Sequence, residues 1–100
     1  MNDFVGYEFE SLIVSGTVQV LSPDKYEALE ASSGALEALL TLEGGDIRFT
    51  YSNISPTDTI GHLLKDGGTF ILRGRRQIAH FKCIKAYAND ARISITYGRE

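Results

Sequence analysis

Residues 46–64 read DIRFTYSNISPTDTIGHLL, and this stretch decides the fold class. Its first part alternates: Ile47, Phe49 and Tyr51 share one side of an extended backbone, while Arg48 and Thr50 share the other. Such alternation is typical of a strand with one buried face. A polar loop over residues 52–59 follows, and the apolar residues 60–64 are expected to form one helical turn. A Gly67-Gly68 turn then closes the stretch.

Similar patterns recur outward from this stretch. Strands are predicted at residues 12–21 with a bend at Gly16, at 69–73, at 81–86, and around the alternating Ile93, Ile95 and Tyr97. The spacing of Ile78 and Phe81 predicts a short turn before strand 81–86. We therefore predict an all-β fold, a small antiparallel β-sandwich of about seven to eight strands with at most one or two short helical turns.

Two segments allow more than one interpretation. Residues 25–31 favour a helix by composition, but they are short enough that an irregular loop fits equally well. Residues 35–43 also favour a helix by propensity, yet their leucines and alanines alternate. Because Gly44-Gly45 separates this segment from strand 47–51, we favour a β-hairpin.

The length of 100 residues predicts one domain. Residues 1–10 are expected to form an N-terminal strand or a docking arm, and residues 11–100 a single β-sandwich domain. The aromatic residues Phe4, Tyr7 and Phe9 make the first ten residues a candidate contact with a neighbouring subunit. The predicted core consists of residues expected to point inward from the predicted strands: Val18, Leu40, Ile47, Phe49, Leu72, Phe81, Ile93 and Ile95.

Several classes of protein are disfavoured. The longest apolar runs are only a few residues, so no membrane partner is expected, and the acidic N-terminus predicts no cleaved secretion signal. Cys83 is the only cysteine, so no intrachain disulfide forms, and its apolar neighbours predict a small buried core residue.

Charge is unevenly distributed along the chain. Residues 1–46 carry nine acidic and one basic residue, for a net charge of −8, and residues 47–100 carry nine basic and four acidic residues, for +5. Arg73, Arg75 and Arg76 surround Gly74 and form a candidate interface for an acidic surface or a second copy. The alternative is that the fold mixes the two halves on one surface. Sequence-specific nucleic-acid binding is disfavoured by the pI of about 5.3.

No catalytic, metal-binding or cofactor-binding residues are predicted. His62 and His80 each lie beside apolar residues without a partner at metal-ligand spacing. The segment Thr57-Asp58-Thr59 lacks the context of a hydrolytic nucleophile. The aspartates lie in predicted turns, where carboxylates accept hydrogen bonds from local amides.

The pattern of strands and turns resembles that of small β-sandwich proteins encoded among phage head and tail genes. The resemblance rests on residues 11–15 (SLIVS), 47–51 (IRFTY), Pro56-Thr57, residues 61–64 (GHLL) with Gly67, Ile78-x-x-Phe81-x-x-Ile84, and residues 91–97 (ARISITY). It covers about residues 11–98 and is weak at 22–34. The loop departs from the pattern, because Ser52-Asn53-Ile54 stands where Asp-Gly-Thr is expected.

The resemblance implies a non-enzymatic virion protein, made in the host cytoplasm and acting by protein–protein contacts. The expected roles are capsid decoration or a neck or tail accessory. The expected partners are the major capsid protein, a neck or tail protein, and further copies of the chain in a homo-oligomer. The pattern is also similar to β-sandwich modules appended to chitin-degrading enzymes, so the alternative is a carbohydrate-binding or accessory module. Such a module should expose a row of aromatic rings, and this chain has no tryptophan.

Overall fold

The computed structural model describes residues 5–22 and 36–99, and the side chains of residues 8–22 and 36–98. The expected helix or loop at residues 25–31 lies outside the described residues. Within them the chain forms eight strands and one short helix: β1 (Val5–Val14), β2 (Gln19–Val20), β3 (Leu36–Glu43), β4 (Ile47–Thr50), β5 (His62–Leu64), β6 (Thr69–Arg73), α2 (Arg75–His80), β7 (Lys82–Lys85) and β8 (Ala91–Arg99).

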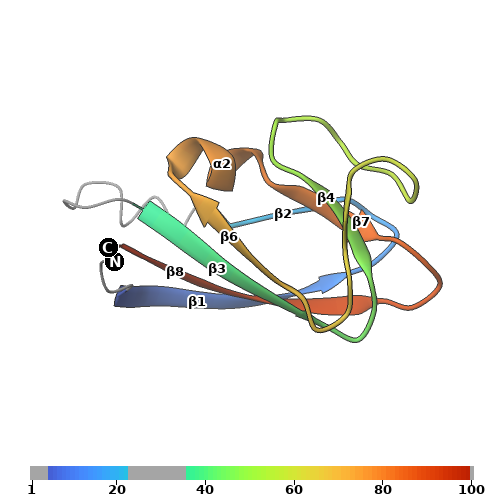
Figure 1. Ribbon diagram of the computed structural model, residues 1–100, viewed down its shortest axis with the longest axis horizontal. Coiled ribbons are helices and arrows are strands. Elements are labelled where there is room, and N and C mark those ends of the chain that lie inside the picture. Colours follow the sequence, from blue (N-terminus) through green and yellow to red (C-terminus); the bar gives the residue numbers. More distant parts are fainter. Residues whose placement is uncertain (1–4, 23–35, 100) are drawn as a thin grey trace.

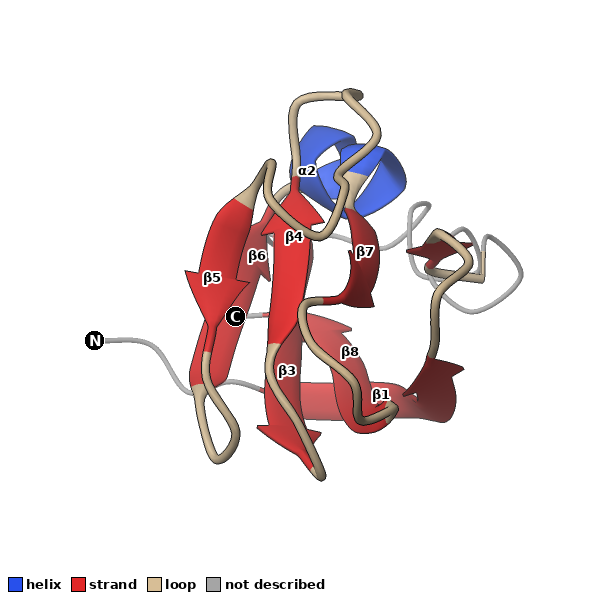
Figure 2. Cartoon of the chain, turned by 90° about the vertical axis from the view of Figure 1, so that its right-hand side faces the viewer, coloured by secondary structure: helices blue, strands red, loops and turns tan. Residues whose placement is uncertain are grey.

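The strands form two antiparallel four-stranded sheets, which confirms the predicted all-β class. Sheet A has the order β1-β8-β3-β6, and Figure 1 shows its long strands β1, β8 and β3 running side by side. Sheet B has the order β2-β7-β4-β5, and Figure 2 shows β4 flanked by β5 and β7. The edge strands are therefore β1 and β6 in sheet A, and β2 and β5 in sheet B.

Hydrophobic alternation decides the secondary structure of residues 36–43, which form a strand and not a helix. Leu36, Ala38, Leu40 and Leu42 are all buried, while Thr41 and Glu43 are exposed. Because strand geometry sends successive side chains to opposite faces, this order buries one complete face of β3. The strand interpretation of this segment is thus confirmed over the helical one.

The predicted hairpin between β3 and β4 is wrong. β3 pairs with β8 and β6, whereas β4 pairs with β7 and β5, so the Gly44-Gly45 turn carries the chain from sheet A to sheet B. The backbone of Leu42 is already occupied, because its N–H donates to Gly68 O at 3.0 Å and its carbonyl accepts from Gly67 N at 2.8 Å. Gly44 adopts a positive φ of 95°, which favours glycine, and its N–H donates to Asp66 Oδ1 at 3.1 Å.

Three further elements differ from prediction. The strand expected at residues 12–21 ends at Val14, and the chain bends before the two-residue β2. Residues 62–64 form β5 and not a helical turn, since they pair with β4. The turn expected near Ile78 is a six-residue helix, α2, whose Ile78 is buried.

Residues 5–10 form the first half of β1, where Phe9 pairs with Thr96 of β8. Of the two alternatives for residues 1–10, this part of the chain therefore behaves as a strand of sheet A. Phe4 lies outside the described residues.

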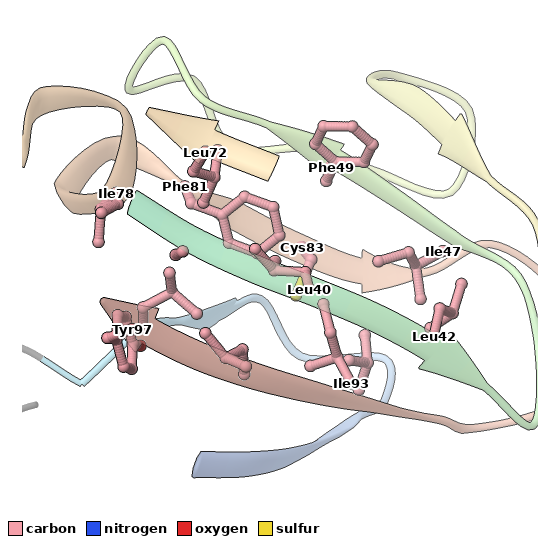
Figure 3. Packing of buried hydrophobic residues seen from close by; sticks show 14 of the residues in the cluster. Leu40, Leu42, Ile47, Phe49, Leu72, Ile78, Phe81, Cys83, Ile93 and Tyr97 are labelled. Atoms are coloured by element: carbon pink, nitrogen blue, oxygen red, sulfur yellow. The ribbon is translucent and has the colours of Figure 1, made fainter. Parts of the chain in front are cut away.

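The inward faces of both sheets meet in one hydrophobic core (Figure 3). Seven of the eight predicted core residues are buried: Leu40, Ile47, Phe49, Leu72, Phe81, Ile93 and Ile95. Val18 is the exception, because it lies in the bend before β2 and is only half-buried. The sequence prediction also omitted Tyr97 and Ile78, which are among the largest fully buried side chains.

Cys83 lies in this core, fully buried, on the inward face of β7. Burial disfavours the charged thiolate and raises the pKa of the Cys83 thiol to about 12. The unfolded chain releases this proton at about pH 8.5, so thiol burial contributes stability below that pH and the contribution is lost between about pH 9 and 12.

We therefore expect native protein at pH 8 to react with a thiol reagent such as DTNB only as fast as it unfolds. The stability advantage over Cys83→Ala should shrink as pH rises from 8 to 10, because alanine does not titrate. Urea titrations at several pH values measure this difference. Rapid labelling of the folded protein would place Cys83 at the surface.

Candidate protein-contact surface

His62 and Thr57, two of the polar residues singled out in the sequence, are engaged in local contacts. The His62 ring packs on Phe49 with centroids 5.4 Å apart and on Tyr51 at 5.8 Å. Thr57 closes its own loop, because its hydroxyl oxygen accepts from Ile60 N at 3.0 Å. Over residues 5–22 and 36–99, no three His, Cys, Asp or Glu side chains are placed to hold a metal ion. In the same residues, no helix has the length and apolar character needed to cross a membrane.

The outward-facing side of sheet A is the most distinctive surface. Because Ala38, Leu40, Ile93, Ile95 and Leu72 point into the core, their neighbours along each strand point outward. The strand register aligns these neighbours in rows across the sheet. The apolar row is Phe9, Thr96, Leu39 and Ile71, and the hydroxyl row is Ser11, Ser94, Thr41 and Thr69.

These two rows define the outer face of sheet A, and none of their eight residues is charged. Two of its three apolar side chains are exposed, Phe9 at 58% and Ile71 at 42%, and Leu39 between them is half-buried. Ile13, 48% exposed, follows at the end of β1. A contiguous face without charges, carrying exposed apolar side chains, is typical of a surface that contacts another protein.

Charged residues lie only at the two ends of this face. At one end Arg73 pairs with Glu37, its cross-strand neighbour, through an ion pair to Oε2. At the other end Arg92 lies opposite Glu43 in the register of β8 and β3, and its Nη1 donates to Ser11 Oγ at 3.0 Å. Both Arg92 and Glu43 are exposed.

Sheet B does not present an equivalent face. Its outward side carries two cations, Arg48 and Lys82, and the chain after β4 folds back over it. Arg48 Nη1 donates to the carbonyl of Gly61 at 3.2 Å, and the Thr50 hydroxyl donates to the carbonyl of Ile54. Figure 2 shows this loop beside β4. Pro56 within it is buried.

The predicted interface residues do not form one cluster. Phe9 lies on the outer face of sheet A in edge strand β1, and Arg73 lies at the end of the opposite edge strand, β6. Arg75 and Arg76 begin α2, and the side chains of Phe4 and Tyr7 are outside the described residues. The sequence reasoning missed Leu39, Ile71 and the hydroxyl row. Their signal was that the middle of the outward phase lacks charges in each strand, with Glu37, Glu43, Arg73 and Arg92 confined to the strand ends.

The two charge halves of the chain are interleaved in sheet A. Its order β1-β8-β3-β6 alternates strands from residues 1–46 with strands from residues 47–100. Sheet A therefore fits the alternative in which the fold mixes the acidic and basic halves of the chain. The ion pair between Glu37 and Arg73 is a direct contact between the two halves. An acidic flank facing a separate basic corner is not what this sheet provides.

A second feature is an aromatic hollow of about 230 Å³ between the edge strands β5 and β6, lined by Phe49, Tyr51, His62, Leu63, Leu64 and Phe70. Phe49 and Phe70 have centroids 4.7 Å apart, and Tyr51 and Phe70 5.7 Å. The rings therefore pack mainly on one another, and they close the side of the core where neither sheet continues.

No family model, curated protein or solved structure matches the chain. The surface of the described residues, above all the outer face of sheet A, is therefore the structural observation that bears on function.

Proposed function

We propose that this chain is a non-enzymatic structural protein of a phage virion, either a capsid decoration protein or an accessory of the neck or tail. It acts through protein–protein contacts made by the outer face of sheet A. It is made in the host cytoplasm, works in the assembled particle, and needs no cofactor.

The observation that carries the proposal is the uncharged outer face of sheet A. Phe9 and Ile71 are exposed there. Inward-facing apolar residues of sheet A, such as Leu40 and Leu72, are fully buried. Covering apolar area of this kind gains about 25 cal/mol per Å². A face held by four paired strands loses little conformational entropy on binding, which favours a contact role.

The virion assignment rests on the resemblance of the strand-and-turn pattern. A rigid all-β domain suits that role, because many copies on a symmetric particle strengthen a weak contact through avidity.

The proposal predicts that the protein is part of purified particles. Particles from a strain carrying the gene, banded on a density gradient, should contain the chain in a constant ratio to the major capsid or tail protein by quantitative mass spectrometry. Ile71→Asp on β6 should reduce its incorporation several-fold, because a carboxylate would be buried in the contact. The matched control is Val20→Asp, which changes an exposed residue on the edge strand of the other sheet. Absence of the wild-type chain from banded particles would rule out the virion role.

A carbohydrate-binding module is the second candidate, and the aromatic hollow favours it. Sugars stack on exposed aromatic faces, but Tyr51 and Phe70 are half-buried and Phe49 is buried. A titration with chitin oligosaccharides, followed by the NMR signals of Tyr51 and Phe70, distinguishes the two candidates. Saturable shifts at these rings would favour the sugar-binding function.

A further inference from the structure

We propose that the outer face of sheet A binds the same face of a second copy of this chain, with a twofold axis parallel to the strands and midway between β8 and β3. The inference deepens the proposed function, on whose contact surface it rests, by naming the partner. Two sheets related in this way stack in the aligned manner common to packed β-sheets.

The register of sheet A makes the apolar row complementary to itself under this symmetry. The twofold axis places β1 over β6 of the second copy, and β8 over β3, while each row stays opposite the same row. Phe9 then meets Ile71 of the second copy, and Thr96 meets Leu39. Each contact occurs twice, as a closed isologous interface requires.

The hydroxyl row is also complementary to itself under this symmetry. Ser94 meets Thr41 of the second copy, and Ser11 meets Thr69. Hydroxyl groups both donate and accept, so such a row can pair with itself without leaving a buried charge.

The charged end of the face selects this orientation. Arg92 of β8 and Glu43 of β3 are opposite one another in the same row, so the axis places Arg92 over Glu43 of the second copy, and the reverse. Both side chains are exposed, and within the described residues neither has an ion pair in the monomer. Two opposite-charge contacts at the rim fix the register of the pair.

The reversed orientation is unfavourable. Turning the second copy end to end would exchange the two ends of each strand and bring Glu43 over Glu37 of the other copy. Because Glu37 is already paired with Arg73, this orientation gives Glu43 no partner of opposite charge. It also places Arg92 over Gly98, so the charge pattern disfavours the competing stack.

The test uses charge reversal on the full chain. Sedimentation velocity over a concentration series should show that the wild type dimerises weakly, since a single four-stranded face lies at the small end of protein interfaces. Arg92→Glu alone and Glu43→Arg alone should each raise the dimer dissociation constant by about tenfold or more, because each creates two like-charge contacts.

An equimolar mixture of the two variants should restore dimerisation. In that mixed pair, the glutamate introduced by Arg92→Glu in one copy faces the arginine introduced by Glu43→Arg in the other. The unchanged Arg92 and Glu43 face each other at the second contact, so both contacts are again of opposite charge. The mixture also separates an intermolecular contact from a cross-strand effect within one chain, which mixing cannot repair. Arg76→Glu on α2 is the matched control and should leave the dissociation constant unchanged, because this exposed residue lies off the face.

Three results would overturn the inference: a wild type that stays monomeric, single reversals without effect, or a mixture that fails to restore the dimer. A monomer found in purified particles would mean that another virion protein covers the face, which leaves the proposed function standing. A dimer with the expected mutant pattern but absent from particles would contradict the virion role alone.

Discussion

Phe49→Ala is expected to lower the free energy of unfolding by about 3–5 kcal/mol, the range for removing a buried aromatic ring. Phe49 is 4% exposed and lies on the inward face of β4 (Figure 3). Its ring contacts Phe70 of sheet A at 4.7 Å and Phe81 before β7 at 5.6 Å, centroid to centroid. Its loss would leave a cavity between the two sheets, where rigid strands cannot collapse to fill it.

Urea unfolding followed by circular dichroism measures this change. Phe9→Ala is the matched control, because it removes the same ring from an exposed position and should cost less than about 1 kcal/mol at dilute protein concentration. Equal losses for the two variants would mean that Phe49 does not face the core. A domain of this size has a total stability of roughly 5–15 kcal/mol, so the Phe49 variant should be close to unfolding at 37 °C.

The inward phase of most strands was predictable from local sequence. In β8, Ile93, Ile95 and Tyr97 alternate with Arg92, Ser94 and Thr96, and only one of these sets can be buried in a sheet. The same holds for β4 and β6. This is why seven of the eight predicted core residues are buried. Val18 is not, because there the chain leaves strand geometry and the period of two no longer applies.

Strand pairing was not predictable in the same way. The pattern of residues 36–50 is compatible with a hairpin, because both segments alternate and a glycine turn joins them. What decides against it is non-local: β8, far later in the chain, occupies one side of β3, and the turn at Gly67 and Gly68 takes the backbone groups of Leu42. Contacts so distant in sequence leave no signal within β3 and β4 themselves.

The candidate surface was likewise predictable only in part, because it depends on strand pairing. Phe9 could be suspected because it is aromatic and near the chain start, but its partnership with Leu39 and Ile71 depends on the order β1-β8-β3-β6. The position of Arg92 opposite Glu43 likewise follows from the strand register alone. The arginine cluster at Gly74 was visible as composition, yet Arg73 is engaged with Glu37, which the sequence places 36 residues away.

Glu10 is the residue whose role the sequence concealed most. It belongs to the acidic N-terminus, yet it also shares the inward phase of Leu12 and Val14 on β1. In the structure it is buried at 9% exposure, and its carboxylate accepts three hydrogen bonds. The donors are Ser22 N at 3.1 Å, Ser22 Oγ at 2.7 Å, and the hydroxyl of the fully buried Tyr97.

These bonds join β1, β8 and the segment that follows β2 at one end of the core. Hydrogen bonds to a carboxylate stabilise more than neutral ones, and a donor that loses its partner when buried keeps its desolvation cost. Glu10→Ala is therefore expected to lower the free energy of unfolding by roughly 2–4 kcal/mol. Glu43→Ala, which truncates an exposed glutamate of β3, should change it by less than about 0.5 kcal/mol at dilute protein concentration, where the chain is monomeric.

A double-mutant cycle separates the hydrogen bonds from general packing. Ser22→Ala removes one donor, so Glu10→Ala should cost less in that background than in the wild type, with a coupling of about 0.5–3 kcal/mol as found for residues in direct contact. Glu10→Gln keeps one acceptor oxygen, and should lose less stability than Glu10→Ala. Strict additivity of Glu10→Ala and Ser22→Ala in urea unfolding would show that the carboxylate does not hold Ser22. The end of β1 would then be stabilised by its ladder with β8 alone, and the burial of Glu10 would be a cost that the rest of the core offsets.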